Sequence, residues 1–319
     1  MKDHQRRVLR LFALFFMAYL GIDNPWTPHV FQKSVTSDFD RSLRATKGTA
    51  SLTKGKDSSK RHHGEGQVVI SGKKVNYRYP PTFSKTTSDS IQHMDLVVGV
   101  LSSSSSTGTR MRQDIRDTWA KDYKGRVFFV VAGNWSTIEE QFEELQDLIW
   151  VDMEEEWHHL TYKVQTFYHA VENHFGLSYD YLMKTDDDSY VNLPKFQSFI
   201  QSQPKKNYYA GKCMSNKPPI RDPRNRYYIP EEVYSSSTYP VYAAGDGYLV
   251  SKDANKCMLD YIASIDYMAM EDVATGILAD KCSVPCTKSW FTSRSGALQH
   301  RIKEENAMQK IHAKYYRQS

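Results

Sequence analysis

Cysteine is scarce in this sequence and absent before Cys213. The four cysteines, Cys213, Cys257, Cys282 and Cys286, form no CxxC pair, and only Cys282 and Cys286 are close together. A structural zinc site needs four ligands at close paired spacings, so the pattern argues against zinc and favours disulfides formed in an oxidising compartment. Four cysteines allow three connectivities, and the sequence does not choose among them.

Net positive charge is missing from the C-terminal two-thirds of the chain. Residues 1–90 contain 16 Lys+Arg and 7 Asp+Glu, which gives a net charge of +9. The whole chain has 42 Lys+Arg and 37 Asp+Glu, so residues 91–319 contain 26 and 30 and have a net charge of −4. The overall charge of +5 therefore comes from the front of the chain. Surfaces that bind nucleic acid are basic, so nucleic acid is not an expected ligand. A chain of 319 residues that is 40% hydrophobic and 25% charged suits a folded domain with extra segments.

Long hydrophobic runs are also missing. The segment 11–22 (LFALFFMAYLGI) is the one membrane candidate, and three arginines precede it. It is shorter than the ~20 residues that a typical bilayer requires, but Val8, Leu9 and a snorkelling Arg10 extend it enough for a thin early-secretory membrane. We expect an uncleaved signal anchor at 11–22, a cytosolic tail at 1–10 and a luminal remainder. The alternative is a cleaved signal peptide, although no convincing small-x-small cleavage site follows.

Residues 23–90 show no sustained apolar period. They are rich in Ser, Thr, Lys and Gly, as in SLTKGKDSSKRHHGEG, which predicts a flexible stem. Within this segment His62 and His63 are expected to be linker residues rather than metal ligands. The folded domain is expected over residues 91–319.

Short β-branched runs alternate with helical patterns after residue 90. The strand patterns lie at 95–101, 126–132, 148–152 and 179–184, and the helical patterns at 109–120, 138–148 and 160–174. No internal repeat is visible. The alternation predicts an α/β fold with a mixed, mostly parallel sheet flanked by helices, and with ligands at the C-terminal strand edges.

Three adjacent carboxylates follow the last of these strands. Asp186, Asp187 and Asp188 repel one another and are costly to hold at the end of a buried strand unless a cation neutralises them. Oxygen ligands of this kind suit Mn²⁺ or Mg²⁺, which usually bridge protein carboxylates to substrate phosphates. The run therefore indicates a diphosphate ligand. The alternative, a solvated acidic turn, fits less well directly after a hydrophobic strand.

Six blocks occur in order along the chain, and together they carry a family resemblance. They are RQDIRDTW at 112–119, VFFVVAG at 127–133, DMEEEWHHLTYK at 152–163, KTDDDSYV at 184–191, YPVYAAGDGYLVS at 239–251 and EDVATG at 271–276. From about His93 onward the chain resembles the β-1,3-glycosyltransferase family of Golgi type II membrane enzymes, which includes β-1,3-galactosyltransferases, β-1,3-N-acetylglucosaminyltransferases and the fringe proteins. Three positions depart from the family pattern: Trp157 replaces the usual Tyr, His159 the usual Asn, and Asp246 a small or neutral residue.

The resemblance implies a GT-A fold, a UDP-sugar donor, Mn²⁺ as cofactor, with Mg²⁺ as the other choice, and inversion at the anomeric carbon. Matched position by position, it implies that Asp188 and His300 ligate the metal. It also implies nucleotide-sugar contacts, or support of that pocket, by Arg112, Arg116, Lys163, Asp186 and Asp187.

An inverting transfer needs a general base for the acceptor hydroxyl. Glu271 and Asp272 precede a helical pattern, and a helix N-terminus favours ionised carboxylates. One of the two could instead cap the helix. We rank Asp272 first and Glu271 second as the base.

The segment YPVYAAGDGY is the expected acceptor pocket. Gly245 and Gly247 bracket a turn around Asp246 and allow close backbone approach, either to the acceptor sugar or within a tight bend. Tyr242 and Tyr248 either stack on a sugar or belong to the core.

The sequence as a whole is therefore expected to encode a hexosyltransferase of protein glycosylation that moves galactose, or N-acetylglucosamine, in β-1,3 linkage to a glycan on a glycoprotein or glycolipid. Galactose is preferred on family frequency alone. A catalytically silent carbohydrate-binding protein is the alternative; a phosphohydrolase is disfavoured because the DxDx[TV] pattern is missing. Asn134 begins the one N-x-Ser/Thr sequon and is an expected glycosylation site. The expected location is the Golgi membrane. The oligomeric state is not predicted.

Overall fold

The computed structural model describes residues 63–81, 93–123, 127–289, 291 and 297–316. The chain divides into two compact units, Met1–Asp57 and Ser58–Ser319, and every described residue belongs to the second. The expected tail at 1–10 and anchor at 11–22 lie outside the described residues. Within the described part of the chain, no helix has both the length and the apolar character needed to span a membrane.

The described elements alternate between strands and helices, as the sequence predicts. The strands are β1 (Gly64–Ile70), β2 (Lys73–Tyr79), β3 (His93–Leu101), β4 (Val127–Val131), β5 (Leu148–Val151), β6 (Ser178–Asp186), β7 (Tyr190–Val191), β8 (Tyr209–Met214), β9 (Tyr242–Ser251), β10 (Cys286–Lys288) and β11 (Leu298–Gln299). The α-helices are α2 (Ser106–Asp117), α3 (Glu139–Leu145), α4 (Leu160–Asn173), α5 (Leu193–Ile200), α6 (Lys252–Tyr261), α7 (Glu271–Lys281) and α8 (Ala307–Tyr316), and two 3-10 helices are η2 (Trp135–Thr137) and η3 (Trp157–His159).

A nine-stranded mixed sheet in the order β1-β2-β5-β4-β3-β6-β9-β8-β10 organises the fold. The central strands β5, β4, β3 and β6 run parallel. On one side β2 and β1 are antiparallel; on the other, β9 pairs antiparallel with both β6 and β8, and β10 is parallel to β8. The expectation of a mixed sheet is confirmed, but the expectation of a mostly parallel one is wrong, because four of its eight pairings are antiparallel.

The hairpin β1–β2 corrects the expected boundary of the folded domain. Residues 63–81 were expected to be part of a flexible stem, yet β1 and β2 pair over seven residues each and β2 pairs with β5. Val68 and Ile70 of β1 and Val75, Tyr77 and Tyr79 of β2 are buried, and the residues between them are exposed or half-buried. Ser71 and Gly72 form the turn with positive φ angles of 48° and 75°. The alternation in QVVISGKKVNYRY is a hairpin signal that the polar composition of the surrounding segment obscured.

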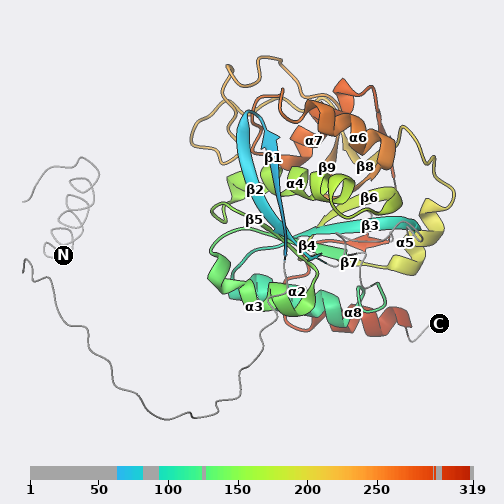
Figure 1. The fold of residues 1–319 in the computed structure, drawn as a ribbon. Coiled ribbons are helices and arrows are strands. Elements are labelled where there is room, and N and C mark those ends of the chain that lie inside the picture. The colour runs from blue at the N-terminus through green and yellow to red at the C-terminus, as the bar shows by residue number, and fades with distance from the viewer. Residues whose placement is uncertain (1–62, 82–92, 124–126, 290, 292–296, 317–319) are drawn as a thin grey trace, which may run out of the picture. The chain divides into compact units, whose positions relative to one another are not determined.

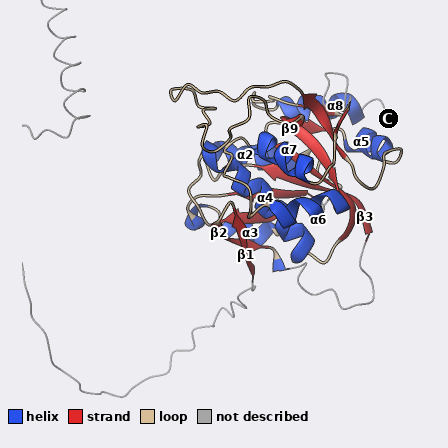
Figure 2. Cartoon of the chain, turned by 90° about the horizontal axis from the view of Figure 1, so that it is seen from above, coloured by secondary structure: helices blue, strands red, loops and turns tan. Residues whose placement is uncertain are grey.

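Helices cover both faces of the sheet and produce two hydrophobic cores. One core contains side chains of α4, α6 and α7, and the other contains side chains of α2, α3, α5 and α8. Figure 1 shows these helices on opposite faces of the sheet. Seen from above in Figure 2, α4, α6 and α7 lie side by side, consistent with the contacts among them. Leu101 and Asp186 are paired at the C-terminal ends of the parallel strands β3 and β6.

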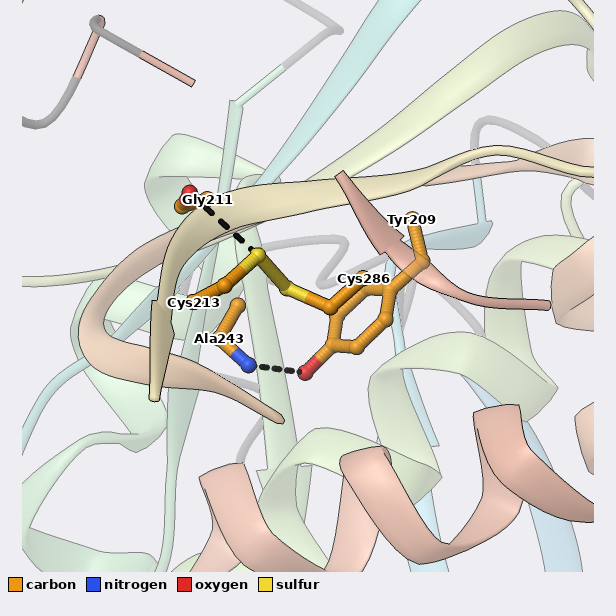
Figure 3. Close-up of a disulfide and its surroundings, with 5 residues drawn as sticks. All are labelled: Tyr209, Gly211, Cys213, Ala243 and Cys286. Carbon is orange, nitrogen blue, oxygen red and sulfur yellow. Dashed lines mark hydrogen bonds between the residues drawn. A yellow bond between two sulfur atoms is a disulfide. The ribbon is translucent and has the colours of Figure 1, made fainter. Parts of the chain in front are cut away.

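Two disulfides confirm the prediction from the cysteine pattern. Cys213 bonds to Cys286 and joins β8 to β10, as Figure 3 shows, while Cys257 of α6 bonds to Cys282 at the end of α7. Beside the first disulfide, the Ala243 backbone N–H donates to the Tyr209 hydroxyl at 2.8 Å. Both disulfides lie in the half of the molecule that contains β9, β8 and β10, where one joins two strands and the other joins α6 to α7. They therefore stabilise the packing around α7.

Candidate active site

A pocket of about 1090 Å³ opens where β6 and β9 meet the N-terminus of α7. Its wall includes the acidic residues Asp186, Asp246, Glu271 and Asp272, together with His300. The pocket therefore unites the end of one strand, part of a second strand, the first turn of a helix and the segment after β11. Sequence reasoning placed these residues in one site, and the fold brings them together.

Asp186, Asp188 and His300 form a cluster at the C-terminal end of β6. One possible ligand atom from each lies within 4.8 Å of the others. His300 Nδ1 is 3.1 Å from Asp188 Oδ1 and 3.0 Å from the Ser189 hydroxyl. Although His300 is close, Asp188 Oδ1 is buried and receives no hydrogen bond from any described residue. A buried carboxylate oxygen without a hydrogen-bond donor needs another partner. Together with the His300 imidazole and the Asp186 carboxylate, it forms a set of ligand atoms that fits a divalent cation.

The turn that carries His300 is held against the acidic run. The Ile302 backbone N–H donates to the Asp188 carbonyl at 2.8 Å, and Arg301 has a left-handed backbone with φ 69°. The short pairing of β11 with β7 brings Gln299 opposite Tyr190. His300 lies more than a hundred residues after the acidic run in the sequence, so this long-range pairing is what places it there.

Lys184 links the acidic run to the acids of α7. Its Nζ lies 2.8 Å from Asp186 Oδ1 and 2.7 Å from Glu271 Oε1, and it also donates to the Gly245 carbonyl at 2.5 Å. Burial alone would lower the pKa of this ammonium, but the two carboxylates outweigh burial and raise it. Lys184 is therefore a buried cation at the junction of β6, β9 and α7. Lys184 begins the KTDDDSYV block, but nothing in the sequence around it indicates this role.

Glu271 and Asp272 have different surroundings. Glu271 accepts hydrogen bonds from Lys184 and from the Tyr248 hydroxyl at 2.6 Å, and burial raises its pKa to about 7. Asp272 Oδ2 accepts from the Gly245 backbone N–H at 3.1 Å and Oδ1 accepts from the Val273 N–H at 2.9 Å. Burial also raises the pKa of Asp272. Glu271 has its oxygens engaged by side chains, whereas Asp272 is oriented by backbone amides at the wall of the pocket.

The segment around Gly245 is strand rather than turn. Gly245 and Gly247 both lie within β9, so the predicted turn is wrong. A Cβ on Gly245 would lie 2.8 Å from Glu271 Oε1, and one on Gly247 would lie 2.7 Å from Leu298 Cδ1. Neighbouring side chains lie too close to leave room for a Cβ at either position, and this packing, not the backbone conformation, is the reason that both residues are glycine.

Only part of the expected acceptor pocket lines the observed one. Tyr242, Gly245 and Asp246 are on the wall, while Gly247 and Tyr248 are buried behind it, and Tyr248 contacts Glu271 instead of the open space. The choice left open for Tyr248 is resolved in favour of the core. The residues on the wall lie in the first part of β9, whereas Gly247 and Tyr248 lie further along the strand, where they pair with Thr185 and Lys184 of β6.

Asp246 is a partly buried acid whose carboxylate has few partners that could stabilise its charge. Its Oδ1 is buried and has no hydrogen-bond partner among the described residues, and burial raises its pKa while the charges of Lys212 and His300 oppose that rise. The residue lies on the wall of the same pocket.

Arg112, Lys163 and Asp187 form a buried network beneath the acidic run. Arg112 is fully buried and donates to the Ser102 hydroxyl at 2.9 Å, and that hydroxyl donates to Asp187 Oδ2 at 2.8 Å. Lys163 donates to the Ser102 carbonyl at 2.5 Å and to Glu155 Oε1 at 2.7 Å. Burial raises the pKa of Asp187 to about 6. These groups hold the C-terminal end of β3 against the end of β6.

Arg116 and Asn134 lie away from the pocket wall. Arg116 makes a two-point contact with Asp147, at 2.8 and 2.9 Å, and its guanidinium lies 4.8 Å from the centre of the Phe129 ring. Its interactions thus join α2 to the entry of β5. Asn134 is exposed and accepts from the Ser136 backbone N–H at 3.1 Å as the cap of η2. Its glycosylation stays a prediction.

Comparisons with known proteins agree with the blocks in the sequence. Lactosylceramide 1,3-N-acetyl-beta-D-glucosaminyltransferase of Xenopus tropicalis is 28% identical over 233 residues, covering 66% of this chain and 62% of that protein. Beta-1,3-galactosyltransferase 1 of Mus musculus is 29% identical over 194 residues, covering 56% of this chain and 59% of that protein. The chain thus spans about three fifths of the length of these relatives.

A solved structure of a glycosyltransferase involved in the glycosylation of the major capsid of PBCV-1 aligns with 69% of this chain and 99% of its own, with 14% identity and a TM-score of 0.35. The family match itself spans residues 110–289, more than half of the 319 residues. Those residues include the acidic run, β9 and all of α7. The chain belongs to the Galactosyltransferase family.

Proposed function

We propose that the chain is an inverting hexosyltransferase that moves galactose, or N-acetylglucosamine, from a UDP-sugar to a hydroxyl of an acceptor glycan in β-1,3 linkage. The observation that carries the proposal is the pocket itself, which brings together side chains that could hold a cation at the end of β6 and an oriented carboxylate at the start of α7. A displacement at an anomeric carbon needs both: a charge that stabilises the leaving diphosphate and a base for the incoming hydroxyl.

The residues that would hold the metal are Asp188 and His300, with Asp186 beside them. Their carboxylate and imidazole donors suit Mn²⁺, with Mg²⁺ as the other choice, and the unpartnered Asp188 Oδ1 supports a cation there. When bound, such an ion supplies positive charge for a diphosphate. Asp186 and Asp187 would then lie toward the nucleotide, with Arg112 and Lys163 supporting that side through Ser102.

Asp272 is the proposed base. It takes the proton from the acceptor hydroxyl, the hydroxyl oxygen forms a bond to the anomeric carbon, and the bond from that carbon to the diphosphate breaks as UDP leaves. Inversion follows because this is a single displacement. Its two backbone hydrogen bonds fix the carboxylate, while burial raises its pKa and so strengthens it as a base. Glu271 ranks second because Lys184 and Tyr248 occupy its oxygens.

The wider setting is proposed in the same way. The fold would be of the GT-A type, the acceptor glycan would be carried by a glycoprotein or a glycolipid, and the enzyme would act in the Golgi lumen behind an anchor at 11–22. Support comes from the sequence blocks, the disulfides, which need an oxidising compartment, and the name of the Xenopus relative, which specifies lactosylceramide.

A donor screen tests the proposal. The purified chain is incubated with Mn²⁺ and a panel of UDP-sugars, first with water and then with β-galactoside and β-N-acetylglucosaminide acceptors, and released UDP and the product linkage are measured. We expect UDP release and a β-linked product with UDP-galactose or UDP-N-acetylglucosamine. Binding of a UDP-sugar with no transfer to any acceptor would indicate the catalytically silent alternative instead.

A further inference from the structure

An aromatic corner in the pocket has no role in the transfer chemistry proposed above. Trp157 and Tyr227 both line the pocket, their ring centroids are 5.1 Å apart, and their planes meet at 80°. The Arg226 guanidinium lies 4.4 Å from the centre of the Trp157 ring and so holds the indole in place. Tyr227 keeps 42% of its surface exposed, which leaves ring area that a ligand could bury.

The strand-to-helix segment that carries Trp157 is fastened to the residues that precede Asp272. The Thr161 hydroxyl donates to the Met268 carbonyl at 2.5 Å, and the Tyr267 hydroxyl donates to the His158 carbonyl. Because Met268 leads directly into α7, these contacts set Trp157 beside the segment that positions the proposed base.

The loop that carries Tyr227 is also fixed to α7. The Ile229 backbone N–H donates to the Ile220 carbonyl at 3.0 Å, which closes the loop on itself. Ile229 and Tyr239 then pack in a small core with Met268, Val273 and Ala274. The corner is thus assembled from two segments that both contact the start of α7.

The pocket therefore has two walls of different chemistry. The carboxylates and the imidazole suit a cation and a diphosphate, while the corner is aromatic and flanked by Ile220 and Leu160. A pyranose has an apolar face of C–H groups that packs on aromatic rings, whereas a diphosphate does not. At about 1090 Å³ the pocket is slightly larger than the ~300–1,000 Å³ typical of small-molecule sites, so it has room for more than one ligand group.

We propose that Trp157 and Tyr227 form a subsite for the second sugar of the acceptor, the one that follows the sugar bearing the reacting hydroxyl. This inference rests on the proposed function and makes it more specific: the acceptor is an oligosaccharide of at least two sugars. The terminal sugar lies against Asp272, and the next pyranose packs its C–H face into the aromatic corner.

Matched acceptor pairs test the subsite. Each disaccharide is compared with its own terminal sugar: methyl β-lactoside with methyl β-galactoside, and the methyl glycoside of diacetylchitobiose with methyl β-N-acetylglucosaminide. We measure kcat/KM for transfer by the parent, by Trp157→Ala and by Trp157→Phe. In at least one pair the parent is expected to prefer the disaccharide about tenfold or more, as ~1.4 kcal/mol of added binding would give.

The variants separate contact from folding. Trp157→Ala should bring the preference close to one while kcat/KM for the monosaccharide stays within about twofold of the parent, because the terminal sugar keeps its contacts. Trp157→Phe should retain part of the preference, which a folding defect would not do. Tyr261→Ala removes a tyrosine that is 38% exposed on α6 and outside the pocket wall, and it should leave the preference unchanged.

Saturation-transfer NMR with the same glycosides gives a readout that does not need turnover. Contact of the protein with the ring protons of the second sugar in the parent, lost in Trp157→Ala, would support the subsite even if no transfer were observed, and that result would count against the proposed function alone. The subsite is overturned if the parent shows no preference in either pair and no such contact, or if Trp157→Ala keeps both.

Discussion

At the scale of single residues, the pocket separates groups that touch the open space from groups that hold them. Asp272 and His300 line the cavity and Asp188 contacts His300, whereas Tyr248 lies behind the wall and Lys184, which reaches the wall, is almost fully buried; both of these donate hydrogen bonds to Glu271. A buried lysine between two carboxylates is stable only as a complete set, because removing any partner leaves an uncompensated charge.

Asp188→Ala should abolish transfer and weaken UDP binding only when Mn²⁺ is present, because the lost carboxylate acts through the metal. Calorimetry of UDP binding with and without Mn²⁺ measures this directly. Asp95→Ala is the matched control. Asp95 and His93 are exposed and lie with the half-buried Asp180 at the opposite ends of the same parallel strands, so loss of Asp95 should leave Mn²⁺ dependence intact. Equal UDP affinity of Asp188→Ala and parent in saturating Mn²⁺ would remove Asp188 from the metal site.

The elements around the site depend on close packing between α7 and β9. A Cβ at Gly276 of α7 would lie 2.3 Å from Tyr242 Cβ and 3.1 Å from Tyr242 Cα. Tyr242 also lines the pocket, so this one contact connects the stability of the helix with the shape of the site.

Gly276→Ala tests that contact. In an unhindered helix the change from glycine to alanine stabilises by about 1 kcal/mol. Here we expect a loss of about 1–3 kcal/mol, because the added methyl group forces strand and helix apart. Thermal and urea unfolding measure the change, with Asp280→Ala, an exposed position on the same helix, as the control. A melting temperature at or above that of the parent would show that α7 can move away from Tyr242 without cost.

A second test concerns α4 and the hairpin. Burial lowers the pKa of His169 from 6.5 to about 4, so the imidazole is neutral near pH 7 and its Nδ1 lies 2.7 Å from the Tyr77 hydroxyl. The unfolded chain binds this proton more readily between those two pKa values. Stability is therefore full above pH 6.5, falls as the pH drops from 6.5 toward 4, and levels off below.

We expect His169→Gln to reduce this acid-induced loss, since the glutamine amide can hydrogen-bond to the Tyr77 hydroxyl in either direction and does not titrate. Melting temperatures of parent and variant between pH 8 and pH 4 provide the measurement. Parallel curves for the two proteins would mean that another group, such as the neighbouring His174, dominates acid sensitivity.

Elements with strong local signals were the ones that the sequence predicted. The central strands and α2, α3 and α4 lie within a few residues of the expected ranges, because buried parallel strands read as continuous apolar runs. The helix expected at 138–148 ends at Leu145, because Gln146 adopts a left-handed backbone and the chain enters β5. The hairpin β1–β2 is difficult to recognise from the sequence because the surrounding segment is polar. The turn expected at Gly245 is wrong because a glycine required by close packing looks the same in the sequence as a glycine required by a turn.

The sequence predicted the residues on the wall of the site but not the buried residues that position them. Asp186, Asp272 and His300 lie on one pocket wall as expected, whereas the role of Lys184 as a link between two strands and a helix depends on pairings far apart in sequence. Periodicity along a single segment contains no information about such contacts.

On the scale of the whole molecule, the two disulfides close loops with sequence separations of 73 and 25 residues around the half of the sheet that carries the site. Loop-closure entropy predicts about 4 kcal/mol for the longer loop and about 3–4 kcal/mol for the shorter one. We expect nonreducing peptide mapping to recover Cys213–Cys286 and Cys257–Cys282, and reductant to lower the melting temperature. Other pairings, or four free thiols in correctly folded protein, would contradict this assignment.

The central claim is that one pocket holds a donor site and a separate base, and Asp272→Asn tests it most directly. The substitution keeps the shape of the side chain and its hydrogen-bonding reach but removes its basicity, so UDP affinity in Mn²⁺ should match that of the parent. Transfer should fall by about 10²–10⁴-fold, the range for loss of a general base. Calorimetry and the transfer rate are measured on the same preparation. An Asp272→Asn enzyme with parental UDP affinity that kept more than about a tenth of the parental rate, well above that range, would contradict the assignment of Asp272 as the base.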